Sequence, residues 1–259
     1  MVKTILHKAS DRFEVRSDRG SSYFSFSFGD RYREDRLGFG ALRVINDDTI
    51  PPGMGFGSHP HDNMEIISIV LEGEVTHRDN LGTESISTPR RLQVISAGTG
   101  LYHSEVNENA AATCSMLQIW VYPDRLNVKP HYQQADYTFP PTPGAWELVI
   151  APLAEGAAPQ VGAAAPLVGA AVPPVPAGIN QSAWFHLGNL PSDSSQPYTL
   201  KKEGNGLYVF VIEGSVSVEG QNLGYRDGLG ISGAEKVNVL ALSPSLLLLM
   251  EVPMVDFMV

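Results

Sequence analysis

The stretch HPHDNMEIISIVLEGEV, residues 59–75, contains the two patterns that decide the fold. Its apolar run Ile66–Leu71 has the length and β-branched composition of a strand, and Gly73 follows as a turn signal. Similar short runs recur along the chain, as at Tyr23–Phe28, Met116–Tyr122 and Tyr208–Ile212. Since no long segment has a sustained helical period, the sequence predicts an all-β protein built of antiparallel strands.

A weak internal repeat predicts two copies of one unit. Val70–Val75 (VLEGEV) resembles Val211–Val216 (VIEGSV), which lies 141 positions later. We therefore expect two similar barrels, an N-terminal one over residues 1–130 and a C-terminal one over residues 131–259. The segment 151–178 is rich in Ala, Pro and Gly, and we expect it to be a flexible linker or a surface excursion.

Composition limits the class of function. The formal net charge of the 259 residues is −10, and basic side chains are interleaved with acidic ones, which argues against direct nucleic-acid binding. The single cysteine, Cys114, excludes a disulfide within the chain and favours a reducing compartment. The first residues lack an apolar stretch of signal-peptide length, so we expect a cytoplasmic protein without a membrane partner.

Two short motifs carry potential metal ligands. His59 and His61 are two residues apart, so an extended strand projects both to one face, and His103 and Glu105 have the same spacing. Imidazole with carboxylate suits Fe(II), Mn, Ni, Cu or Zn, whereas Ca and Mg prefer oxygen ligands. A lone His-x-His pair is more often an ordinary hydrogen-bonded or surface pair, so the surrounding residues decide between these hypotheses.

The surrounding residues resemble those of a known family. Glycines precede both motifs, as in the cupin superfamily, and the segments Phe39–Asn46, Val70–Glu74, His77–Asp79 and Ser96–Gly100 are similar to those of pirins. The resemblance implies a bicupin, two antiparallel double-stranded β-helix (jelly-roll) barrels. It also implies one divalent metal per chain, with Fe(II) expected first, held in the N-terminal barrel by His59, His61, His103 and Glu105.

The C-terminal copy lacks these ligands. Adding the repeat offset to the four expected ligands gives Leu200, Lys202, Pro244 and Leu246, and His186 is the only histidine after His131. We therefore expect no metal site in the second barrel.

The fourth ligand has an alternative, because many cupins use the acid that follows the His-x-His motif, here Glu65. We favour Glu105 and expect Glu65 to orient an imidazole. His77 is expected to be structural, and His7, His131 and His186 are treated as ordinary. Met54, Phe56, Met64 and Met116 are candidates for a pocket wall or for core packing.

The resemblance also implies an activity. Several pirins act as quercetin 2,3-dioxygenases, so we expect a flavonol, bound through its 3-hydroxyl, to be cleaved by dioxygen with loss of carbon monoxide. Glu105 would be the catalytic group that takes the hydroxyl proton. The alternatives are a non-enzymatic metal-binding regulatory protein with a protein partner, and another dioxygenase or isomerase. Fold and ligands do not separate these functions.

Overall fold

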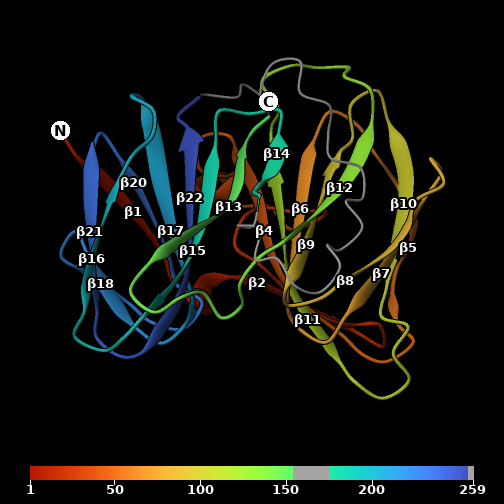
Figure 1. Cartoon of the computed structure of the whole chain (residues 1–259), viewed down its shortest axis with the longest axis horizontal. Coiled ribbons are helices and arrows are strands. Elements are labelled where there is room, and N and C mark those ends of the chain that lie inside the picture. The colour runs from red at the N-terminus through yellow and green to blue at the C-terminus, as the bar shows by residue number, and fades with distance from the viewer. Residues whose placement is uncertain (154–174, 256–259) are drawn as a thin grey trace, which may run out of the picture.

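The structure, a computed structural model, describes residues 1–153 and 175–255, and it is almost entirely β. Two seven-stranded sheets each face a four-stranded sheet, which confirms the predicted all-β bicupin with two antiparallel jelly-roll units. Figure 1 shows the two units side by side, one in red to yellow-green and the other mainly in blue. Two short 3-10 helices, Ala9–Asp11 and Glu34–Arg36, lie in the connections.

The N-terminal unit combines two sheets. The order of the first is β12-β9-β6-β11-β4-β3-β2 and that of the second is β5-β10-β7-β8. The strands are β2 (Phe13–Ser17), β3 (Gly20–Phe24), β4 (Leu42–Ile50), β5 (Gly55–His61), β6 (Glu65–Glu72), β7 (Val75–Asp79), β8 (Glu84–Ser87), β9 (Arg91–Ser96), β10 (Leu101–Val106), β11 (Cys114–Val121) and β12 (His131–Asp136).

The C-terminal unit repeats this arrangement. Its sheet orders are β1-β20-β17-β22-β15-β13-β14 and β16-β21-β18-β19. The strands are β1 (Lys3–His7), β13 (Trp146–Pro152), β14 (Ala177–Ile179), β15 (Trp184–Leu190), β16 (Ser195–Thr199), β17 (Asn205–Glu213), β18 (Val216–Val218), β19 (Gln221–Leu223), β20 (Gly228–Ser232), β21 (Lys236–Ala241) and β22 (Ser245–Pro253).

The sequence predicted a boundary between residues 130 and 131, but the sheets do not divide there. Strand β1 pairs with β20 of the C-terminal sheet, where Figure 1 shows the N-terminus, and β12 pairs with β9 of the N-terminal sheet. Both are edge strands of their sheets, so each needs only one neighbour, and that neighbour lies in the other half of the sequence from the one we assigned.

Most of the Ala/Pro-rich segment 151–178, which we expected to be a linker or a surface excursion, lies outside the described residues. Both flanks of residues 154–174 are ordered in one sheet, where β13 pairs in parallel with β14 through Ile150 and Ala177. The strands on both sides of this range thus belong to the same C-terminal sheet.

The two units share one hydrophobic core, which lies between the seven-stranded sheets. Alternating residues of β6 face opposite sides of its sheet. Ile67 and Ile69 belong to the shared core, together with Phe185 and Leu248 of the other unit. Residues of the opposite parity, Ile66, Ser68 and Val70, face the interior of the N-terminal unit. This alternation fixes which polar side chains of β6 can reach a site inside the barrel.

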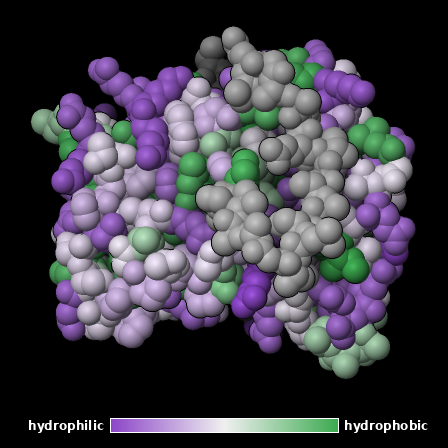
Figure 2. All heavy atoms as spheres, viewed as in Figure 1, coloured by the Kyte–Doolittle hydropathy of each residue, from purple (hydrophilic) through white to green (hydrophobic). Residues whose placement is uncertain are grey.

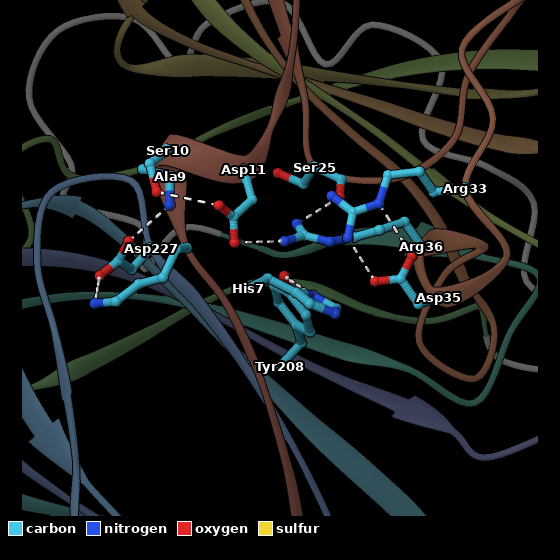
Figure 3. A network of polar contacts seen from close by, with 11 residues as sticks. His7, Ala9, Ser10, Asp11, Ser25, Arg33, Asp35, Arg36, Tyr208 and Asp227 are labelled. Atoms are coloured by element: carbon cyan, nitrogen blue, oxygen red, sulfur yellow. Dashed lines mark hydrogen bonds and ion pairs between the residues drawn. The ribbon is translucent and has the colours of Figure 1, made fainter.

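The junction of β1 with both units contains a polar network (Figure 3). The His7 ring lies beside the Tyr208 hydroxyl, with 2.9 Å between Nδ1 and Oη, and is buried. Arg36 is also buried, donates to the Ser25 carbonyl oxygen and lies 3.4 Å from Asp11. Burial lowers the pKa of His7 to about 4, and the positive charge of Arg36 acts in the same direction.

His7 should make the protein less stable in acid. The unfolded chain binds the proton near pH 6.5 but the folded chain only near pH 4, so stability is full above pH 6.5 and falls towards pH 4. The difference of about 2.5 pKa units corresponds to about 3 kcal/mol. Urea unfolding at pH 7 and pH 4.5 should show that the free energy of unfolding falls less between these pH values in His7→Asn than in the original protein. Equal losses would contradict this assignment.

Candidate metal centre

Three pairs of polar side chains, each spaced two residues apart, lie on neighbouring strands of the sheet β5-β10-β7-β8. His59 on β5 is directly opposite His103 on β10, and His103 is opposite Asp79 on β7. Glu105 is in turn opposite His77. Since residues of equal parity share one face of a strand, these side chains all point into the barrel.

The three predicted histidine ligands converge. The ring centroids of His59, His61 and His103 are 4.4–4.9 Å apart, and one nitrogen from each ring lies within 4.8 Å of the others. Among residues 1–153 and 175–255, they are the one group of His, Cys, Asp or Glu side chains that converges in this way. The structure thus brings together the three histidines that the sequence singled out, and their role as metal ligands stays a prediction.

The histidine nitrogens are suited to a metal ion. The Nε2 atoms of His61 and His103 are buried and have no hydrogen-bond partner, which is costly unless a ligand satisfies them. Burial lowers the pKa of His61 to about 4 and that of His103 to about 2, and the neighbouring histidines act in the same direction. Neutral imidazoles with free lone pairs are the form that binds a divalent transition metal.

The carboxylate of Glu105 lies outside the group of converging nitrogens. It is completely buried and accepts hydrogen bonds from Ser68 Oγ (2.9 Å), Gln93 Nε2 (2.6 Å) and Gln118 Nε2 (2.5 Å). Burial raises the pKa of Glu105, although the Ser68 hydrogen bond opposes the shift. The side chain is thus held on the inner face, two residues from His103, in an environment that favours proton uptake.

Glu65 does not orient an imidazole, contrary to our expectation. It has the parity of Ile67 and Ile69, so it points out of the barrel towards the other unit. There it accepts hydrogen bonds from Ser96 Oγ (2.6 Å) and from Asn180 Nδ2 (3.1 Å) of the other unit. Glu65 is therefore part of the contact between the two units.

A cavity of about 180 Å³ opens beside His59 and His61. Its other walls combine aromatic and polar side chains, namely Phe24, Phe28, Phe56, Trp120, Ser22, Asn46, Asp48 and Gln118. Of the four pocket candidates from the sequence, only Phe56 is among these; Met54 is exposed, and Met64 and Met116 pack in apolar clusters.

Two polar cavity residues were missed by the sequence analysis. The Oδ1 atoms of Asn46 and Asp48 are buried without a hydrogen-bond partner. Burial raises the pKa of Asp48 to about 7, opposed by a hydrogen bond from Ser22. The sequence signal was their spacing of two on β4, which places both on one face of that strand.

The C-terminal unit has no histidine on the strands that correspond to the histidine-bearing sheet of the first unit. The sheet β16-β21-β18-β19 corresponds in its order to β5-β10-β7-β8. Its inward residues include Tyr198, Val237 and Val239, which belong to a hydrophobic cluster. Tyr198 lies beside the buried His186 and donates a hydrogen bond to Glu251, but no three His, Cys, Asp or Glu side chains converge there among the described residues.

The fold and the three-histidine centre together define a cupin with a potential metal site in its N-terminal unit. The sequence model of the pirin family matches residues 7–121, and a model described as the quercetinase C-terminal cupin domain matches residues 175–252. Quercetin 2,3-dioxygenase of Escherichia coli (strain K12) is 32% identical over 248 residues, which cover 96% of this chain and 98% of that protein. The chain therefore belongs to the pirin family.

Solved structures agree with this assignment. The crystal structure of YhhW from Escherichia coli matches with a TM-score of 0.85 and 30% identity, covering 99% of this chain and 100% of that chain. The nickel(II) complex of the bacterial pirin YhhW matches with a TM-score of 0.84, again with 30% identity, covering 98% and 100%. A relative with this fold thus binds a divalent metal.

Two further observations describe the surface and the helices. On the face shown in Figure 2, hydrophobic residues are scattered among hydrophilic ones around the part that grey atoms cover. In the described part of the chain, no helix has the length and apolar character needed to cross a bilayer.

Proposed function

We propose that this protein is a metal-dependent dioxygenase that cleaves flavonols. The observation that carries the proposal is the cavity, which brings aromatic walls and unpartnered oxygen acceptors to the edge of the three-histidine centre. The similarity to a quercetin 2,3-dioxygenase over nearly the whole chain supports the same substrate class. Fe(II) remains the predicted metal, the cytoplasm remains the predicted location, and dioxygen is the second substrate.

The proposed ligands are His59, His61, His103 and Glu105. To bind the metal, Glu105 would give up one of the hydrogen bonds that its carboxylate now accepts. A bound divalent ion would supply a Lewis acid and open coordination positions. The protein itself would position the substrate. Phe56 and Trp120 lie on the cavity wall beside the histidines, so they can contact an aromatic ring.

Asp48 and Asn46 would accept hydrogen bonds from ring hydroxyls, because their free oxygens need donors. Glu105 would take the proton of the 3-hydroxyl as a general base. The cavity is smaller than the roughly 300–1,000 Å³ of pockets that enclose a drug-sized ligand. A flavonol would therefore present the edge that carries its 3-hydroxyl to the histidines and keep part of its outer rings outside the cavity.

The proposed site predicts one metal equivalent per chain. Only the N-terminal unit brings three imidazoles together among the described residues. Elemental analysis after reconstitution with Fe(II) and removal of excess ion should give one equivalent. Two equivalents, or none, would contradict the proposed site.

The activity can be tested in two stages. Protein loaded with Fe(II) without oxygen should bind a flavonol such as quercetin, seen as a shift in its absorbance, and should bind the matching flavone without the 3-hydroxyl much more weakly. Admission of dioxygen should then consume the flavonol and release carbon monoxide. Binding without turnover would instead favour the regulatory metal-binding alternative, and failure to bind any flavonol would exclude the proposed substrate class.

A further inference from the structure

His77 and Asp79 lie behind His103 and are completely buried at their side chains. Neither residue is a proposed ligand, and both belong to the third pair of polar side chains on this sheet. His77 Nδ1 is 3.4 Å from His103 Nδ1, and His77 Nε2 is 3.0 Å from Asp79 Oδ2. The three side chains thus form one chain of contacts that leads away from the metal centre.

The chemistry of these groups fixes the direction of the hydrogen bonds. The Asp79 carboxylate can only accept, so His77 must carry its proton on Nε2. If His77 carries this one proton only, its Nδ1 is bare and accepts the proton of His103 Nδ1. His103 in turn is left with a bare Nε2, which is the buried nitrogen without a partner.

We propose that His77 and Asp79 are positioning residues that fix the His103 tautomer and aim its Nε2 at the metal. The inference rests on the proposed metal site only in taking His103 as a ligand. A metal-binding histidine usually donates its second N–H to a carboxylate or carbonyl oxygen. Here a second imidazole is interposed, and it passes the orienting effect of the carboxylate to the ligand. His59 follows the direct form, because its Nδ1 lies 2.7 Å from the Gly57 carbonyl oxygen.

The chain of contacts from His103 through His77 to Asp79, called the relay below, is anchored at Asp79. Asp79 Oδ1 accepts hydrogen bonds from the backbone N–H groups of Leu81 and Thr83, both at 2.9 Å, so the turn after β7 fixes the carboxylate. The Tyr132 ring stacks on His77 with 4.5 Å between centroids. These contacts hold the His77 ring in the plane that the two hydrogen bonds require.

The same network reaches the fourth proposed ligand. Tyr132 Oη lies 3.2 Å from Gln93 Oε1, and Gln93 Nε2 donates to Glu105. His103 and Glu105 are therefore oriented from behind by connected groups on β7, β9 and β12. A change in His77 is expected to act on metal binding through geometry, since His77 itself has no free nitrogen for the ion.

The metal-free protein offers a direct test, since ¹⁵N NMR of labelled histidines distinguishes protonated from bare ring nitrogens. We expect His103 to be protonated on Nδ1 and bare on Nε2, and His77 to be protonated on Nε2. The opposite tautomer of His103 would overturn the proposal without any mutation. This readout involves no activity, so it stands apart from the test of flavonol cleavage.

Two variants separate the hydrogen bond from packing. His77→Phe keeps a ring against Tyr132 but removes the acceptor, whereas His77→Asn keeps an oxygen acceptor near the Nδ1 position. With Ni(II) as the probe in calorimetry, His77→Phe should bind about 10- to 100-fold more weakly. His77→Asn should recover a large part of this loss, and His103 should keep its tautomer.

The control variant is His186→Phe, which replaces a buried histidine of the other unit. It should leave Ni(II) affinity unchanged. Equal Ni(II) affinity in His77→Phe and the original protein would refute the positioning role, while the proposed metal site would stand. Absence of Ni(II) binding in the original protein would instead refute the metal site, and the tautomer measurement would still decide the relay.

Discussion

His61→Ala should lose its metal and all flavonol cleavage while staying folded. The Nε2 of His61 is buried without a partner, and its ring packs edge-on against Trp120 beside the cavity. Truncation removes one ligand and enlarges a space that already exists. The main hydrophobic core lies between the seven-stranded sheets, away from this residue, so it remains intact.

Metal content and circular dichroism are the paired measurements for His61→Ala, with His186→Ala as the control that should keep its metal. A folded variant with one full equivalent of metal would remove His61 from the ligand set. Global unfolding of His61→Ala, but not of the control, would show that the metal is structural.

Glu105→Gln should lower flavonol turnover by about 100- to 10,000-fold, the range for removal of a general base. The neutral amide cannot take the substrate proton. It also turns an N–H donor towards a site where Ser68, Gln93 and Gln118 already donate. Metal affinity should fall as well, since a carboxylate ligand is replaced.

Glu65→Gln is the matched control for Glu105→Gln, because Glu65 is equally buried but faces the other unit. It should keep its metal and its turnover number, and it should lose about 1–3 kcal/mol of stability through its bonds to Ser96 and Asn180. Both variants must be compared after metal loading. A silent Glu105→Gln together with an inactive Glu65→Gln would reverse the assignment.

The sequence predicted the histidine centre because its signal is local. A spacing of two in a strand fixes the face, and three such pairs lie on neighbouring strands. Sequence reasoning used two of these pairs and treated His77 as structural, since nothing local indicates that β7 is adjacent to β10. It also expected Glu65 to point inward, because parity within β6 does not tell which face of the strand is the barrel interior.

The unit boundaries were predicted less well for a related reason. Edge strands such as β1 and β12 carry no sequence pattern that identifies the sheet they join, and their position in the chain suggested the wrong sheet. The aromatic cavity walls were missed because Phe24 and Phe28 come from one segment and Trp120 from another, nearly 100 residues later. Their convergence is a property of the closed barrel and not of any one motif.

The pairing of β1 with β20 imposes an order on folding during synthesis. Residues 3–7 leave the ribosome before every other strand in the described part of the chain, but their partners, residues 228–232, follow more than 200 residues later. At about 5–20 residues per second, this strand waits about 10 to 45 s with an unpaired edge. Strands β2–β12 all end by Asp136, so the barrel that holds the histidine centre can close before the C-terminal sheet is complete.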